Sequence, residues 1–104
     1  MDNGNLNIDF QIIVKHWIET SEEDFNTMLN LYNSKSFVWS LFLGHICIEK
    51  LLKAFYVKKF QQHAPFIHNL LRLTEISGID VTDIYSDWLD KITTFNINAR
   101  YDDY

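Results

Sequence analysis

Apolar residues recur at helical spacing from Phe10 onward, three or four positions apart, with charged residues between them. This pattern predicts a long helix over about 9–33, and Asp9 is a plausible N-cap for it. Residues 1–8 are polar and lack such a pattern, so we expect them to be frayed.

A second helix is predicted over about 36–60, after a short polar break in which Ser34 or Ser36 can act as a cap. Its first half, FVWSLFLGHICI, is apolar nearly all round, which indicates a helix buried on most of its sides. We therefore expect Trp39 and Phe42 to lie in the core, where truncating either to alanine would cost roughly 3–5 kcal/mol.

Two shorter helices complete the pattern. The only proline suits the first turn of a helix over about 65–77, for which Gly78 is a candidate C-cap. A last helix, over about 81–98, would begin at Asp80 or Thr82. Short connections between long helices favour antiparallel neighbours, so the prediction is an all-α, up-down four-helix bundle.

Length and composition fit one helical domain over residues 1–104. The chain has 104 residues, of which 47% are hydrophobic, and its three glycines and one proline leave room for few loops. So short a chain gains stability from a partner, and we expect a homo-oligomer.

The charge and the single cysteine narrow the class of protein. A net charge of −5 disfavours non-specific binding of nucleic acid. No signal peptide and no uninterrupted apolar run of about 18 residues is visible, so no membrane association is expected. Cys47 lies inside an apolar run and is expected to be buried in a reducing compartment, which indicates a cytoplasmic protein.

The first candidate site lies on the second predicted helix. His45, Glu49 and Lys53 follow one another at four-residue intervals, so they share one face. Two interpretations stay open: a solvated ion pair, or a polar strip buried against a second chain or a ligand. His45 and Glu49 alone lack the further ligands that a metal needs, so neither a metal nor a cofactor is expected.

Two further groups of polar residues could contact a ligand. His68 is expected in the first turn of the third helix, either bonded to the backbone or in contact with a phosphate. Near the end of the chain, Arg100 suits bidentate phosphate contact, Tyr101 can stack on a base, and Asp102 with Asp103 could hold Mg²⁺ beside phosphates.

The order of these features resembles the HEPN superfamily over about residues 15–104. The segment GHICIEKLLKA, residues 44–54, looks like the family's run leading to E-K-x-L-K-A. His68 with the leucines that follow it is similar to H-x-L-x-x-L, and Ala99-Arg100-Tyr101 is similar to A-R-Y.

The resemblance implies a helical bundle that dimerises, with a polar cleft near the two-fold axis. Members of the family usually have one more helix after the Arg-Tyr pair, so this chain looks short of a fifth helix. Active HEPN ribonucleases carry an arginine, then four to six residues, then a histidine, whereas Arg100 is followed here by Tyr-Asp-Asp-Tyr without a histidine, so the motif either lies beyond residue 104 or is lacking. With A-R-Y at this place, the chain looks more like the nucleotide-binding branch of the family, which is often encoded beside a minimal nucleotidyltransferase.

The function that the resemblance implies is a homodimeric nucleotide- or partner-binding module, of the kind found in nucleotidyltransferase/HEPN toxin–antitoxin pairs. The alternative is a metal-independent endoribonuclease toxin in which Arg100 stabilises the pentacovalent phosphate, so whether the chain is an enzyme stays open. The expected ligand-binding residues are Glu49, Lys53, His68, Arg100, Tyr101 and Asp102.

Overall fold

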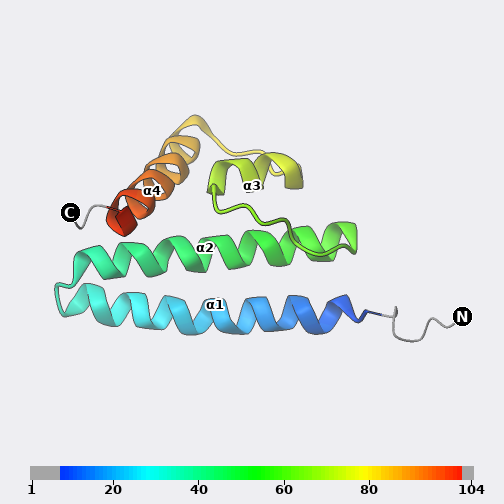
Figure 1. Cartoon of the computed structure of the whole chain (residues 1–104), viewed down its shortest axis with the longest axis horizontal. Helices are drawn as coiled ribbons and strands as arrows, with labels where there is room; N and C mark the ends of the chain where they lie inside the picture. The colour runs from blue at the N-terminus through cyan, green and yellow to red at the C-terminus, as the bar shows by residue number, and fades with distance from the viewer. Residues whose placement is uncertain (1–7, 102–104) are drawn as a thin grey trace, which may run out of the picture.

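Four α-helices form the computed structural model, which describes the backbone of residues 8–101 and side chains as far as residue 96 (Figure 1). The helices are α1 (Phe10–Asn33), α2 (Phe37–Phe60), α3 (Leu70–Ser77) and α4 (Asp83–Tyr101). The all-α class predicted from the sequence is confirmed, and the described residues contain no strand. None of the helices there is long and apolar enough to cross a membrane.

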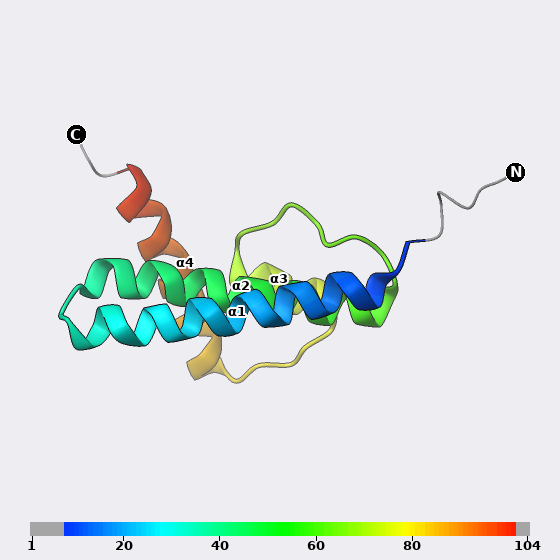
Figure 2. The ribbon, with the colours of Figure 1, turned by 90° about the horizontal axis from the view of Figure 1, so that it is seen from below.

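The long helices α1 and α2 form an antiparallel hairpin and lie side by side over most of their length (Figures 1 and 2). The side chain of Asp9 accepts a hydrogen bond from the amide of Gln11 at 3.0 Å, which confirms the predicted N-cap of α1. Across the hairpin, the Nζ atom of Lys50 lies 2.6 Å from Oδ2 of Asp24. Gly44 allows the close approach, because a Cβ atom there would lie 3.2 Å from the sulfur of Met28.

The other two helices pack on α2 from the side opposite α1, and α4 crosses α2 at a steep angle (Figures 1 and 2). Within the described range, the backbone of α1 does not come close to that of α3 or α4. The four helices therefore form an open bundle in which α2 is the central element. This position explains why polar side chains of α2 can meet residues from the α2–α3 connector.

The third helix begins later than the sequence pattern suggested. We expected a helix over 65–77 that started at Pro65, whereas α3 starts at Leu70, with Asn69 as the N-cap that accepts from the amide of Arg72 at 2.9 Å. Residues 61–69 form an extended connector instead. The physical reason is tertiary: backbone groups at 68 and 70 bond to side chains of α2 and α4, which a helical turn starting at 65 would not allow.

The end of α3 and the start of α4 are set by residues next to them in the sequence. Gly78 ends α3 in the left-handed conformation, with φ at 73°, as predicted for its C-cap. The hydroxyl of Thr82 accepts from the amide of Tyr85 at 3.3 Å at the start of α4. This helix continues to Tyr101, three residues past its predicted end at 98.

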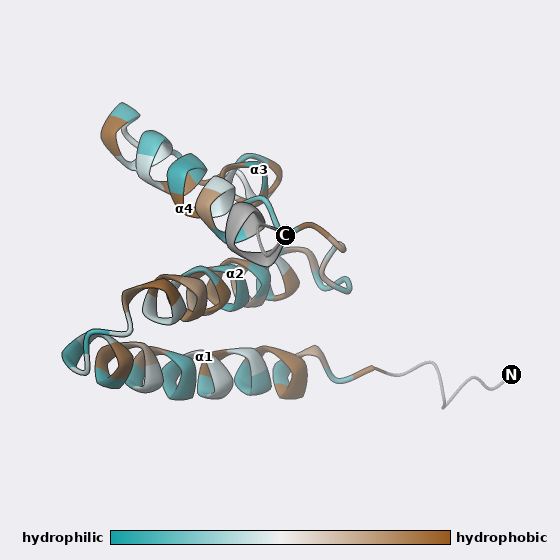
Figure 3. Cartoon of the chain, turned by 60° about the vertical axis from the view of Figure 1, so that its left-hand side comes forward, coloured by the Kyte–Doolittle hydropathy of each residue, from teal (hydrophilic) through white to brown (hydrophobic). Residues whose placement is uncertain are grey.

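The enclosed core is small and lies around the middle of α2 and against α3. Its fully enclosed apolar side chains, among the described residues, are Cys47, Ala54, Val57, Leu70 and Leu73. The expectation that the first half of α2 is buried on most sides was wrong for the single chain: Trp39 is 62% exposed and Phe37 is 54% exposed. The C-terminal half of α4 lies over the first half of α2 (Figure 1), but within the described residues the apolar first turn of α2 stays open to solvent (Figure 3).

Candidate functional site

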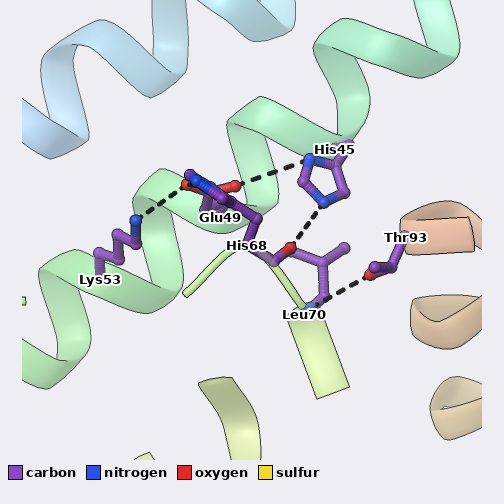
Figure 4. Close-up of polar contacts among 6 residues, drawn as sticks. All are labelled: His45, Glu49, Lys53, His68, Leu70 and Thr93. Carbon is purple, nitrogen blue, oxygen red and sulfur yellow. Dashed lines mark hydrogen bonds and ion pairs between the residues drawn. The ribbon is translucent and has the colours of Figure 1, made fainter. Parts of the chain in front are cut away.

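A polar cluster lies where the α2–α3 connector crosses the middle of α2. His45, Glu49 and Lys53 project from one face of α2, as their spacing predicted, and His68 approaches them from the connector (Figure 4). The side chains of His45 and Lys53 are 2% and 7% exposed, and that of Glu49 is 13% exposed. The strip is therefore not a solvated ion pair, whereas its burial against a second chain or a ligand stays a prediction.

The carboxylate of Glu49 is the centre of this cluster. Its Oε2 atom accepts a hydrogen bond from Nζ of Lys53 at 2.9 Å and another from Nδ1 of His68 at 2.9 Å. Its Oε1 atom lies 3.7 Å from Nδ1 of His45 (Figure 4). The strip is covered by the chain's own connector, and the expected second chain or ligand is not needed to bury it.

The backbone of the connector is held by the same cluster. Nε2 of His45 donates to the carbonyl oxygen of His68 at 2.8 Å, and because a carbonyl can only accept, His45 carries its proton on that nitrogen. Two residues on, the amide of Leu70 donates to the hydroxyl of Thr93 on α4 at 3.1 Å (Figure 4). A continuous set of bonds thus links α2, the connector and α4.

The electrostatics favour an ionised carboxylate. Burial alone would raise the pKa of Glu49, but hydrogen bonds from Lys53 and His68, together with their charges, outweigh burial and lower the pKa. By contrast, burial raises the pKa of Cys47, and the nearby charge of Asp24 adds to the rise against the opposing effect of Lys50. That thiol therefore stays protonated at neutral pH and is a poor nucleophile.

Within the cluster, His68 is the side chain that faces solvent, with 63% of it exposed. Because Nδ1 donates to Glu49, its second ring nitrogen, Nε2, is left for an external ligand. Lys53 is engaged on two sides: it bonds to Glu49, and its Nζ atom lies 5.9 Å from the ring centroid of Trp17. His68 is therefore accessible to an external ligand, whereas Lys53 supports the carboxylate of Glu49 from inside the cluster.

The sequence misplaced one of these residues and missed another. His68 was expected in the first turn of a helix, whereas it lies in the connector before the N-cap of α3. Thr93 was not singled out, although it lies on the buried side of α4 together with Asn96. A polar pair three residues apart on an otherwise apolar stripe is the signal that could have pointed to it.

The C-terminal candidates are not joined to this cluster by any described contact. Arg100 and Tyr101 lie in the last turn of α4 rather than beyond that helix, and their side chains are outside the described set. Asp102 lies outside the described residues altogether. Among the residues whose placement is given, no group of three or more His, Cys, Asp or Glu side chains is arranged to hold a metal ion.

Comparison with known proteins gives one match. A family model described as the HEPN domain matches residues 14–104, which is most of the chain. No curated protein matches the chain, and no solved structure does. The matched range includes all four helices from the first turns of α1 onward, and with them the whole polar cluster.

Proposed function

The chain belongs to the HEPN domain family, and from this we propose that it is a non-catalytic, homodimeric binding module for a nucleotide or for a partner nucleotidyltransferase. The observation that carries the proposal is the Glu49–His68 pair, in which a buried, ionised carboxylate holds an exposed imidazole. In this proposal, His68 binds as the imidazolium, with Nδ1 donating to Glu49 and Nε2 donating to a phosphate oxygen of the ligand, and Glu49 and Lys53 keep the ring in place.

The remaining proposed ligand contacts come from the end of α4. Arg100 would pair with phosphate oxygens through its guanidinium, Tyr101 would stack on the base, and Asp102 would approach a phosphate-bound cation. What supports their inclusion is the family's A-R-Y sequence at this place and the position of residues 100–101 in a helix that packs on α2.

The homodimer is supported by the apolar end of the α1–α2 hairpin, which we call the hairpin end: residues 25–32 of α1 and 36–48 of α2. The segment 36–48 contains no Asp, Glu, Lys or Arg, so two copies of it meet without charge repulsion. Its exposed side chains include Phe37, Val38 and Trp39. Large aromatics bury about 150–250 Å² each, so the half-exposed Phe25, Tyr32, Phe37 and Trp39 together supply about half of the roughly 800 Å² per partner of a standard interface.

The test of the binding function is isothermal calorimetry of the purified protein with ATP and with GTP. The proposal predicts saturable heat for at least one of them at millimolar ligand, and its loss in His68→Ala. The matched control is His16→Ala, because His16 is an exposed histidine on α1 that is not part of the cluster. If neither nucleotide gives heat and no nucleotidyltransferase co-purifies with the protein, the binding function is wrong.

The alternative function is a metal-independent endoribonuclease, and the same Glu49–His68 pair is what favours it. A carboxylate that holds one nitrogen of an imidazole leaves the other nitrogen to act as a general acid or base, while Arg100 would stabilise the pentacovalent phosphate. The net charge of −5 weighs against it. RNA that stays intact with the wild-type protein, or that Arg100→Ala cuts equally well, would exclude this alternative.

A further inference from the structure

A pocket that is separate from the polar cluster lies between the first turns of α1 and the last turn of α2. Its volume is about 560 Å³, and small-molecule sites usually measure about 300–1,000 Å³. It lies at the end of the hairpin opposite the α1–α2 turn (Figure 1), and it shares no lining residue with the polar cluster or the hairpin end. We call it the lysine pocket, and its lining includes Val14, Lys15, Ile18, Glu19 and Lys58.

The α1 side of this pocket has an apolar wall. Val14 and Ile18 are four residues apart, so they lie on the same face of the helix. Val14 is half-buried, and Ile18 is 41% exposed. Covering hydrocarbon that is open to water in this way is favourable, so the wall suits a ligand with an apolar part.

The charged side chains of the lining have a positive sum. Lys15 on α1 and Lys58 on α2 contribute two positive charges, and Glu19 contributes one negative charge. The start of α1 and the end of α2 meet here, so the opposite ends of their helix dipoles offset each other. The side chains therefore decide the sign, and the pocket favours an anion although the net charge of the protein is −5.

Both lysines of the pocket are available to a ligand. Within the described part of the chain, neither Lys15 nor Lys58 takes part in an ion pair or a side-chain hydrogen bond. By contrast, each of the other three lysines of α2 bonds to a group of this chain. Glu19 follows Lys15 by four residues, which is the weaker order for a helical ion pair, and the two side chains are not paired.

The walls of the pocket are held in place by the chain itself. Gln61, which also lines the pocket, ends α2 in the left-handed conformation, with φ at 52°. Its side-chain amide donates to the carbonyl oxygen of Lys58 at 3.1 Å. At the start of α1, the ring of Phe10 packs edge to face on His63 of the connector, with the centroids 5.6 Å apart. A ligand therefore meets a backbone that is already fixed on both sides.

We propose that the lysine pocket binds a small amphipathic anion, a molecule with a carboxylate or phosphate head and an apolar body. The head accepts charge-assisted hydrogen bonds from Nζ of Lys15 and of Lys58, and the body covers the apolar wall. An extended polyanion such as a nucleic acid fits less well, because the acidic α1 residues Glu22 and Glu23 follow the pocket along the helix. The site is independent of nucleotide binding at His68, so either proposal can fail without the other.

The test is a titration of the full chain with octanoate and with octyl phosphate, followed by the amide chemical shifts of the protein. We expect saturable shifts centred on residues 11–19 and 58–61, and the tighter of the two ligands identifies the head group. Octylammonium has the same body with a positive head and should not bind there. Butyrate should bind at least about tenfold more weakly than octanoate, because each buried methylene contributes about fourfold in affinity.

Charge variants give effects of opposite sign. The double variant Lys15→Gln/Lys58→Gln should weaken octanoate binding about tenfold. The double variant Lys35→Gln/Lys91→Gln is the matched control, since it removes the same charge from exposed positions outside the pocket, and it should change binding less than about twofold. Glu19→Gln should instead strengthen binding about twofold, because it removes the negative charge from the lining.

Four results would overturn the proposal: no saturable shifts with either anion, shifts centred on the hairpin end, equal binding of octylammonium, or equal effects of the two double variants. The second and third results would mean that the apolar surface of the protein binds the hydrocarbon body without regard to its head. Circular dichroism of each variant should match the wild type, because every altered side chain is exposed.

Discussion

The single residue on which the candidate site depends most is Glu49. Its spacing from His45 and Lys53 was visible in the sequence, and the structure confirms that the three side chains share one face of α2. The contact with His68 was not predictable, because it requires the connector to fold back across α2, and no periodic pattern encodes that path. Local spacing thus predicts which side chains share a face, whereas the partner of a buried charge depends on tertiary structure.

Glu49→Gln should destabilise the protein at neutral pH and much less in acid. The variant removes the ionised partner of the buried Lys53, which should cost about 2 kcal/mol. Because the pKa of Glu49 is lowered in the folded state, its contribution is fully present above the unfolded value of about 4.3 and is lost as the pH falls through the lower folded pKa.

Urea unfolding of wild type and Glu49→Gln across the acidic range checks this prediction. The difference in the free energy of unfolding should shrink as the pH drops below about 4. Glu22→Gln serves as the control, since Glu22 is exposed on α1. A difference that does not change with pH would show that the ionised carboxylate is not what stabilises the cluster.

At the scale of elements, helix number and order followed from apolar periodicity, while the start of α3 and the end of α4 did not. The start of α3 moved from 65 to Leu70, since the connector gives the carbonyl of His68 to His45 and the amide of Leu70 to Thr93. Caps that depend on near neighbours, such as Asp9 and Gly78, were predictable because their bonding partners lie within a few residues.

Thr93→Val should test the link between the connector and α4. Valine keeps the shape of threonine but removes the acceptor of the Leu70 amide, so a buried N–H loses its partner at a cost of about 1–3 kcal/mol. Hydrogen exchange should also become faster at the amide of Leu70. Thr27→Val is the matched control, because the hydroxyl of Thr27 bonds only within exposed α1. Equal stability of the two variants would contradict the link.

Gly78→Ala should destabilise the end of α3 by about 1 kcal/mol or more, since alanine is strained at positive φ. Its Cβ would also lie 2.8 Å from Nζ of Lys59, which donates to the carbonyl of Ser77. Thermal melts of Gly78→Ala, Lys59→Ala and the double variant should therefore be non-additive. Additive shifts would show that the two residues do not share this contact.

For the whole molecule, the sequence predicted the fold class and the family, but misjudged which apolar residues one chain buries. The first half of α2 is apolar all round, a pattern typical of a buried helix, yet among the described residues Phe37 and Trp39 in this segment are more than half exposed. Periodicity alone cannot distinguish burial in a core from burial in an interface, since both remove the same side chains from water.

Two alanine variants distinguish core from interface. Leu73→Ala should lower the free energy of unfolding by about 3 kcal/mol, because Leu73 is completely enclosed. Trp39→Ala should change the stability of the monomer by less than about 1 kcal/mol, well below the 3–5 kcal/mol expected of a core aromatic. Urea unfolding at low protein concentration, where the monomer dominates, makes this comparison. A loss for Trp39→Ala as large as that for Leu73→Ala would contradict the placement of Trp39 outside the core.

The measurement that most directly tests the proposed homodimeric module is the solution mass by light scattering, with and without added ATP or GTP. We expect a mass of twice the 12.4 kDa of one chain for the wild type, and a shift toward the single-chain mass for Trp39→Ser. Trp88→Ser is the matched control, because it replaces a similarly exposed tryptophan on α4, outside the hairpin end, and it should remain dimeric. A wild-type protein that stays at 12.4 kDa at tens of micromolar, with or without nucleotide, would contradict the dimer and leave the polar cluster as a site on a monomer.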